Sequence, residues 1–541
     1  MKIPHIPVPS PLSLWTTVRS VGPFIGPFNV ACSIAALWAF VKVSKALRWR
    51  LKTTQLRGPP RTSFIYGVLH NLLASQDTGG MYEHWATEYG VAYMIPSVLG
   101  QAIVVLCDPR AIAHFYARET WTYVQTPISL ALLEALIDRG LLSSHGEDHR
   151  RQRKALTPGF SNVAIRKLTS VFYDSAYKAK GAWDIVIESS KDGDVVIEVQ
   201  NWMNHISLDT ISIAGFSHDF GSLDGKRSSV TEVFDTFGTN QQASAIPTKR
   251  TNLFKQLNVT MGEISNESLI RSRREKDVSM SERDEEKSIV GLLIKSEGQD
   301  AGLHMSKEEV VAQVLLVAGY ETTSTGFSLT LSLTWALIGL SRHPDIQTSL
   351  REELLVFGAD PTYDQLKANL PYLDAVVHEI LRLHAPVGEI IRLAAADDVI
   401  PLSELVRTAS GEMTDSISIA KGTLITIPVA AINRSSAIWG HDAKEFKPDR
   451  WLTEDGIDGK AKEVQDHRHL LTFVDGSRMC LGKEFAITEF KAVLSVLVKN
   501  FVFEMRDGSD TPVEVASGLL PRPRVVGEDG IGVPLRVRRY E

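Results

Sequence analysis

The stretch FVDGSRMCLG, residues 473–482, places Cys480 in a short loop between two glycines. Gly476 and Gly482 allow tight turns and a close approach of the backbone to a flat ligand. The apolar segment that follows predicts a helix toward Leu497, and the N-terminal end of that helix would favour a thiolate at Cys480. Only three cysteines occur and they lie far apart, which argues against a disulfide framework and fits a reducing compartment.

A thiolate in a closed, apolar loop needs a neighbouring cation, and Arg478 projects from the other side of the same loop. A haem iron bound by Cys480, with propionates reached by Arg478, would satisfy both groups. Taken alone, these ten residues leave a second interpretation open, which is an ordinary buried cysteine before a helix. The rest of the chain decides between the two.

The loop resembles the haem-binding loop of the cytochrome P450 family at five positions, which are Phe473, Gly476, Arg478, Cys480 and Gly482. The family usually has a second glycine where Val474 stands, so the backbone has less freedom there. The resemblance runs from about Gly58 to the C-terminus. It implies a mainly α fold with small β-sheets (α+β), the cytochrome P450 fold, with residues 58–541 as the haem-thiolate monooxygenase domain.

Two further segments match the family in order and spacing. In HEILR, residues 378–382, Glu379 and Arg382 are three positions apart and share a helix face. FKPDRW, residues 446–451, supplies Arg450. The resemblance implies that Arg450 joins the other two in a buried triad that supports the haem loop.

The segment SKEE, residues 306–309, is a capping box that predicts the start of a helix running to Ser341. Within it, AGYETT at 318–323 contains Glu321 and Thr322. Thr322 can bond to a carbonyl one turn earlier and open a groove in the helix. The pair resembles the acid and alcohol with which the family delivers protons to dioxygen. The alternative, a solvated acid and a self-satisfied threonine, is costly in so apolar a helix.

The segment HRRQRK, residues 149–154, lies where the family holds the haem propionates with a tryptophan and an arginine. Here His149 replaces the tryptophan, and Arg153 follows one turn later. Arg392 matches a further propionate contact of the family. The remaining basic residues indicate docking of an acidic redox partner or, alternatively, a solvated basic face; they are Arg150, Arg151 and Lys154.

Residues 20–41 carry no charged side chain and are long enough to cross the roughly 30 Å hydrocarbon core of a bilayer. We expect a transmembrane helix at about 21–43, regular from near Phe28, within a membrane anchor and basic flank spanning 1–57. Lys and Arg are denser after this segment than before it, which predicts a single-pass protein of the endoplasmic reticulum with its catalytic domain in the cytosol. A cleaved signal peptide is the alternative, but no small-residue cleavage site follows.

Four short runs rich in β-branched residues predict strands, and they are 91–96, 102–109, 399–402 and 423–430. The chain has 58 Lys and Arg against 64 Asp and Glu, a net charge of -6 that gives no reason to expect nucleic acid as a partner. It has no dinucleotide-binding fingerprint and no P-loop, so electrons must come from another protein.

The resemblance implies haem b as the cofactor, O2 as co-substrate, and NADPH as the electron source. Those electrons would arrive through a separate NADPH-cytochrome P450 reductase, with cytochrome b5 as a second candidate donor. By family position, the substrate pocket draws on residues 118–135, 314–318, 387–391 and 517–520, which are largely apolar. An apolar small molecule is therefore expected.

The segments at 146–161 and 438–451 resemble fungal members of the family, many of which oxidise terpenoids in secondary metabolism. A fatty acid or an aromatic xenobiotic would suit the same pocket. A reductase-independent haem isomerase or dehydratase and a non-catalytic haem sensor are rival functions. The pair Glu321 and Thr322 argues against both, because neither function needs proton delivery to dioxygen.

Overall fold

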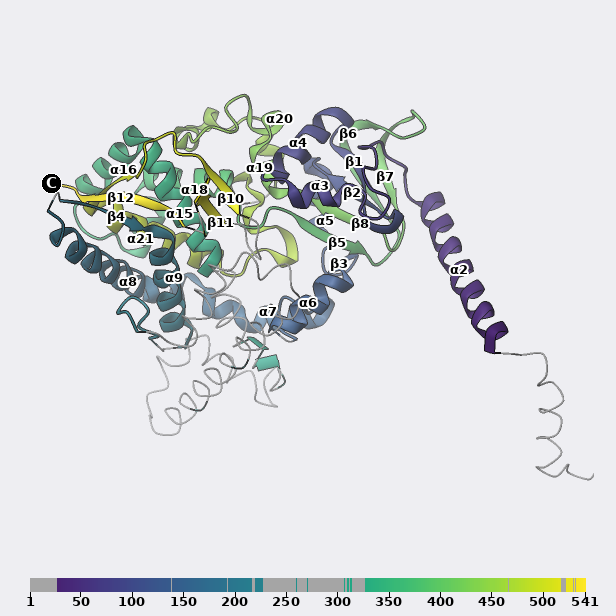
Figure 1. Cartoon of the computed structure of the whole chain (residues 1–541), viewed down its shortest axis with the longest axis horizontal. Helices are drawn as coiled ribbons and strands as arrows, with labels where there is room; N and C mark the ends of the chain where they lie inside the picture. Colours follow the sequence, from purple (N-terminus) through teal and green to yellow (C-terminus); the bar gives the residue numbers. More distant parts are fainter. Residues whose placement is uncertain are drawn as a thin grey trace, which may run out of the picture.

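The computed structural model describes residues 27–137, 139–191, 193–216, 219–226, 326–465, 467–516, 522–528, 530 and 532–541, and, between the larger segments, residues 259, 270, 306, 309–310 and 312–313. Helices dominate these residues and the sheets are small, which confirms the expected fold class. The helical part and the largest sheet occupy opposite sides of the body (Figure 1).

The helices away from the sheet form the core around the cysteine loop. Helix α21 packs on α8, and α15 packs on α9 and α18. Side chains of α21 are buried along nearly its whole length, so this helix runs through the interior. The main helices of this part are α7 (Gly146–Leu156), α8 (Asn162–Glu188), α9 (Val199–Phe216), α15 (Gly326–Arg342), α16 (Pro344–Phe357), α17 (Tyr363–Ala368), α18 (Pro371–Leu383) and α21 (Lys483–Asn500).

The largest sheet has the strand order β1-β2-β8-β5-β3, with β2 and β8 parallel and the other neighbours antiparallel. Its strands are β1 (Ala92–Pro96), β2 (Ala102–Leu106), β3 (Tyr123–Val124), β5 (Ile390–Ala394) and β8 (Leu424–Ile427). The hairpin of β6 (Asp398–Arg407) and β7 (Met413–Ile419) lies nearby. All four predicted strand segments contain strands, and most of their β-branched residues pack in the core, with Val399 as an exposed exception.

The shorter helices of the sheet side are α3 (Leu69–Ala74), α4 (Thr78–Tyr89), α5 (Pro109–Ala117), α6 (Pro127–Ile137), α19 (Val429–Arg434) and α20 (Ser436–Trp439). A second sheet joins β4 (Asp194–Glu198), β12 (Pro534–Arg539) and β9 (Phe501–Met505), so the C-terminal strand lies between two strands distant in sequence. A last hairpin pairs β10 (Val513–Ala516) with β11 (Arg522–Val525).

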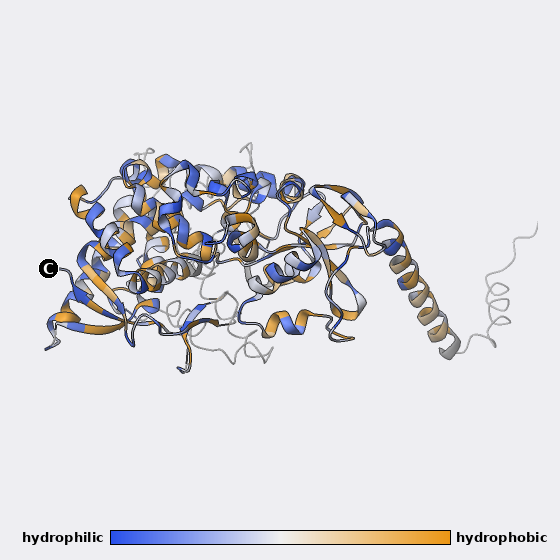
Figure 2. Cartoon of the chain, turned by 90° about the horizontal axis from the view of Figure 1, so that it is seen from above, coloured by the Kyte–Doolittle hydropathy of each residue, from blue (hydrophilic) through white to orange (hydrophobic). Residues whose placement is uncertain are grey.

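Helix α2 (Pro27–Lys52) projects from the body on the sheet side (Figure 1). It begins next to Phe28, as expected, but continues beyond residue 43 through the basic flank, since Lys, Arg, Ala and Leu favour helix. Among the described residues, Val30–Lys52 is long and apolar enough to cross a membrane, with a mean hydropathy of 1.6. In Figure 2 the ribbon of α2, coloured largely as hydrophobic, stands free of the body.

The capping box before the predicted long helix is present. The Ser306 amide donates to the Glu309 carboxylate at 2.8 Å, and the Glu309 amide donates to the Ser306 hydroxyl at 3.2 Å. Helix α15 ends at Arg342, next to the predicted end. Residues 314–325 lie outside the described residues, so the continuity of this helix stays a prediction.

Candidate active site

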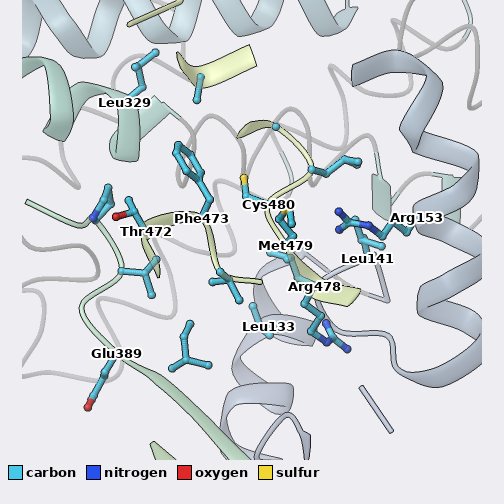
Figure 3. Close-up of a pocket in the computed structure, with 18 of the residues that line it drawn as sticks. Leu133, Leu141, Arg153, Leu329, Glu389, Thr472, Phe473, Arg478, Met479 and Cys480 are labelled. Carbon is cyan, nitrogen blue, oxygen red and sulfur yellow. The ribbon is translucent and has the colours of Figure 1, made fainter. Parts of the chain in front are cut away.

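A cavity of about 460 Å³ lies against the cysteine loop. That volume is typical of pockets for small molecules. Most of the side chains around it are apolar, and they come from α6, α15, α21, the segment 386–390 and the cysteine loop. Figure 3 shows the Cys480 sulfur among these side chains, with the guanidinium groups of Arg153 and Arg478 on one side of it.

The loop that carries Cys480 is shaped by its backbone. The Cys480 amide donates to the Phe473 carbonyl at 2.8 Å, which closes the loop. Gly476 has φ +69°, and a Cβ at this position would collide with the carbonyl oxygen of Tyr116. Only glycine fits both conditions. Helix α21 begins at Lys483, so its positive N-terminal end lies close to Cys480 in the chain, as expected.

Val474 stands where the family usually has a glycine, and its backbone has a conformation that favours glycine. It has φ 60° and ψ 166°, a region that side chains with a Cβ rarely occupy. The surrounding loop therefore holds a β-branched residue in a strained backbone conformation that glycine adopts more readily.

Arg478 is partly buried beside the cavity, and no carboxylate among the described residues is bonded to it. Its Nη2 donates to the Thr120 hydroxyl at 3.1 Å and to the Ser144 carbonyl, while its Nε has no hydrogen-bond partner among the described residues. Burial lowers the pKa of Arg478 to about 10; Glu119 opposes this shift, and Arg392 and Arg153 add to it. Unpartnered buried guanidinium nitrogens are rare, and this one indicates room for an anion.

Arg153 and His149 line the same cavity from α7. Burial lowers the pKa of Arg153, and the nearby Cys480 opposes that shift. Burial and the charges of Arg478 and Arg153 lower the pKa of His149 to about 3, so its ring is neutral at physiological pH. A neutral imidazole retains one N–H donor for a ligand.

Arg392 also lines the cavity, but the structure gives it a partner that the sequence did not indicate. Its Nε donates to Glu119 at 2.8 Å, and its Nη2 lies 2.7 Å from the same carboxylate. Glu119 is fully buried, and burial raises its pKa, although Arg392 and Arg478 act in the opposite direction. No local pattern marks Glu119, since its partner is 273 positions away.

The expected triad lies together behind the cysteine loop. Both guanidinium nitrogens of Arg382 that face Glu379 lie 2.8 Å from it, and Arg450 donates to Glu379 at 3.1 Å. Glu379 and Arg382 have no exposed surface, and Arg450 has 2%. Trp451 adds a hydrogen bond to Glu379 at 2.9 Å. The three charges therefore connect α18 to the segment around Arg450.

Hydrogen bonds of Asn433 and Thr472 connect the triad region to the cysteine loop. Asn433 accepts from the Leu471 amide and donates to the Thr472 hydroxyl at 2.9 Å. Thr472 in turn donates to the carbonyl of Leu381 at 2.8 Å, next to the triad. The start of the cysteine loop is thus bonded to the helix that carries the triad.

The basic residues of α7 do not all remain available at the surface. Arg151 donates to Glu309 through Nη1 at 3.0 Å, and it also pairs with Asp148 at 3.2 Å. The charge of Arg151 is thus matched within the chain, so Arg151 gives the predicted docking patch little support, and docking of a redox partner at α7 stays a prediction. Arg150 and Lys154 are exposed, and Arg150 pairs with Glu147 at 3.5 Å.

The expected pocket segments are present in part. Residues from 125 to 133 and from 387 to 390 line the cavity. Residues 314–318 and 517–520 lie outside the described residues, and so do Glu321 and Thr322. The expectation of a largely apolar wall holds, with a few polar side chains; within the expected segments these are Gln125, Ser129 and Glu389.

The site fits an anionic, flat cofactor bound through sulfur. Cys480 presents a thiol to an apolar cavity that three arginines, Arg153, Arg392 and Arg478, also line. Of these, Arg392 is paired with a carboxylate, that of Glu119. The orphaned Nε of Arg478 adds a buried donor with no acceptor among the described residues. Haem supplies a metal for the sulfur and two carboxylates for the cations, so the residues present fit it.

Comparisons with known proteins agree with this geometry. The sequence model of the cytochrome P450 family matches residues 57–525. The chain is 53% identical to cytochrome P450 monooxygenase claQ of Ampulloclitocybe clavipes over 96% of this chain and 99% of that protein. It is 32% identical to cytochrome P450 monooxygenase 205 of Postia placenta over 97% and 99%. A crystal structure of the cytochrome P450DA haem domain superposes with a TM-score of 0.69 over 90% of this chain and 98% of that one; at 22% identity it shows the fold alone.

Proposed function

The chain belongs to the cytochrome P450 family and is a monooxygenase of that family, and from this premise we propose that it inserts one oxygen atom of O2 into a C–H bond of an apolar small molecule. The observation that carries the proposal is the apolar cavity over Cys480. A substrate with few polar groups gains most from such a wall, because binding removes apolar surface from water.

The proposed cofactor is haem b, whose iron the Cys480 sulfur would bind. Arg153, Arg478 and Arg392 would hold its propionates, and neutral His149 would donate a further hydrogen bond. Haem bound to a cysteine thiolate supplies the cleavage of dioxygen that the reaction needs. Glu321 and Thr322 are proposed to deliver the protons, and the triad of Glu379, Arg382 and Arg450 to keep the cysteine loop in place.

The family requires electrons from a redox partner, and we propose that NADPH-cytochrome P450 reductase supplies them, with cytochrome b5 as a second donor. Helix α2 fits a membrane anchor, and we propose a single-pass protein of the endoplasmic reticulum with residues 58–541 in the cytosol. This arrangement would place the catalytic domain beside a reductase anchored in the same membrane.

For the substrate we propose a terpenoid of fungal secondary metabolism. The support is the apolar wall of the cavity and the similarity to fungal monooxygenases. Their names state no substrate, so a fatty acid or a xenobiotic is the competing hypothesis. An optical titration of the haem-loaded protein with terpenes, fatty acids and polycyclic aromatics tests it. The expected result is a saturable low-to-high-spin change with terpenes, and a change with another class alone would contradict it.

The haem assignment is tested on the same preparation by the spectrum of the reduced, carbon-monoxide-bound protein. The wild type should show the thiolate-haem spectrum, and Cys480→Ala should abolish it. Cys32→Ala is the matched control, because Cys32 is exposed on α2, and it should leave the spectrum unchanged. A thiolate-haem spectrum in Cys480→Ala would contradict the assignment.

A further inference from the structure

Glu389 is an acidic side chain in an otherwise apolar part of the cavity wall. It follows Pro386 and Val387 and directly precedes Ile390, the first residue of β5, and all of them line the cavity. Among the described residues that line this cavity, it is the one carboxylate. An ionisable group in such a wall requires a reason, because its desolvation is unfavourable.

The carboxylate of Glu389 is held from behind the wall. Tyr82 of α4 donates its hydroxyl to Oε2 at 2.7 Å, and Thr426 of β8 donates to the same oxygen at 3.5 Å. Tyr82 is 5% exposed and Thr426 is fully buried, so both donors belong to the packed interior. The side chain is therefore fixed by the fold and is not a mobile surface residue.

The other oxygen has no partner within the described part of the chain. Oε1 of Glu389 has no hydrogen bond to any residue that the structure describes, and Glu389 is an exposed residue that belongs to the cavity lining. Burial raises the pKa of this carboxyl, against the hydrogen bonds from Tyr82 and Thr426, which lower it. Whether neutral or ionised, the carboxyl can accept a hydrogen bond from a hydroxyl group.

The position of Glu389 relative to Cys480 defines which part of a ligand it would meet. In Figure 3 its carboxyl lies well apart from the Cys480 sulfur, on the side away from Arg153 and Arg478. Leucine side chains from α6, such as Leu132 and Leu133, line the cavity as well. A ligand with one end over the sulfur would place an apolar middle along these leucines and its other end near Glu389.

We propose that Glu389 binds a hydroxyl group of the substrate, remote from the carbon that is oxidised, so that the substrate is an apolar skeleton that already bears a hydroxyl. The inference rests on the proposed function and adds a polar anchor to it. The reaction that supplies this substrate would be one that leaves a free alcohol or phenol on the skeleton.

Probes that bind the iron at one end test this directly, because they do not require the natural substrate. We would titrate the haem-loaded protein with N-alkylimidazoles and with ω-hydroxy-N-alkylimidazoles of matched chain lengths, and follow the shift of the haem absorption. At the chain length that reaches Glu389, the hydroxyl should tighten binding to the wild type by about tenfold, the order of one hydrogen bond.

Glu389→Leu should abolish the gain in affinity that the hydroxyl gives the probe, while leaving the affinity for the alkyl probes equal or higher. Glu389→Gln should retain most of this gain in affinity, since an amide still forms a hydrogen bond with a hydroxyl. Glu404→Leu is the matched control, because Glu404 is exposed on β6 and paired with Lys460, and it should behave as wild type.

A gain that survives in Glu389→Leu, or no gain at any chain length, would overturn the inference while the imidazole shift leaves the haem assignment intact. If neither probe shifts the spectrum and the carbon-monoxide complex shows no thiolate-haem, the proposed function itself fails and the inference fails with it.

Discussion

At the scale of the single residue, Val474 has a backbone conformation that a β-branched side chain strains to adopt, with φ 60° and ψ 166°. It stands directly after Phe473 in the loop that carries Cys480. The carbonyl of Phe473 bonds the Cys480 amide, so the loop tolerates this strain while keeping its closing hydrogen bond.

We expect Val474→Gly to raise the free energy of unfolding by about 1 kcal/mol. Relief of about 1–3 kcal/mol of strain is offset by about 0.5–1 kcal/mol from the greater freedom of glycine in the unfolded chain. Urea denaturation of the haem-loaded protein measures the difference. Val474→Ala keeps a Cβ and should show no gain; equal stabilisation by both substitutions would contradict the strain argument.

Glu379 is the second residue whose environment predicts a large effect. It accepts hydrogen bonds from Arg382, Arg450 and Trp451 and has no exposed surface. Removing its charge leaves the buried guanidinium of Arg382 without its carboxylate, whereas Arg450 still pairs with Asp442 at 3.1 Å. Removing one partner of a buried ion pair typically costs about 3–5 kcal/mol.

Glu379→Gln should therefore lower the free energy of unfolding by about that amount, and Arg450→Lys by less, because it keeps the charge. Haem retention during gel filtration provides a second measurement if the variant is too unstable for denaturation. Glu404→Gln, at an exposed ion pair, should change stability by about 0–1 kcal/mol. Similar losses for both glutamates would refute a buried structural role.

At the scale of the element, Glu309 joins the start of one helix to the side of another. Its carboxylate caps Ser306 and accepts hydrogen bonds from Arg151 and Gln152 of α7. Although burial acts to raise the pKa of Glu309, these hydrogen bonds lower it to about 2, from an ordinary value of 4.5.

The sign of the pH dependence follows from this shift. Because the pKa of Glu309 is lower in the folded state, its contribution to stability is fully present above about pH 4.5 and is lost as the pH falls toward about 2. Glu309→Gln should cost about 1–2 kcal/mol at neutral pH, the order of a helix cap and a partly exposed ion pair.

Urea denaturation of Glu309→Gln and wild type at pH values from neutral down to about 3 tests this coupling, since the wild-type advantage should narrow only below about pH 4.5. Glu404→Gln is a suitable control, because Glu404 forms an exposed ion pair with Lys460, and its effect on stability should be small at every pH. A difference that is constant across this pH range would contradict the assignment to Glu309.

At the scale of the whole molecule, the anchor and the body meet at the base of α2. The Trp49 indole donates to Thr423 at 2.9 Å, and Lys52 pairs with Asp397 at 2.7 Å. The Thr54 amide donates to the Ser418 carbonyl at 2.9 Å. The exposed apolar part of α2 precedes these contacts, so the anchor and the contacts can be removed separately.

Deletion of residues 1–47 should release the protein from membranes with little loss of stability, because it spares Trp49 and the residues after it. Deletion of residues 1–57 also removes the contacts at the base of α2 and should lower the thermal unfolding temperature further. Vesicle flotation and thermal denaturation of both variants measure the two effects. Full membrane association of the shorter deletion would contradict a single anchor in α2.

The sequence by itself determined the features that depend on neighbouring residues. The loop around Cys480, the capping box at Ser306, the helix from near Phe28 and the strand segments all follow from local spacing, propensity and backbone freedom. The resemblance of the loop and of HEILR to one family also needed only the order of residues.

Only the tertiary structure decided which charges meet. Arg392 binds Glu119, Arg151 binds Glu309, and Glu389 of the cavity lining accepts a hydrogen bond from Tyr82. The two partners in each pair are separated by more than 150 positions, so no local period connects them. Packing of distant elements brings such groups together. A buried charge is then stable only where the fold supplies a partner of opposite charge or a hydrogen-bond donor, because burial removes its solvation.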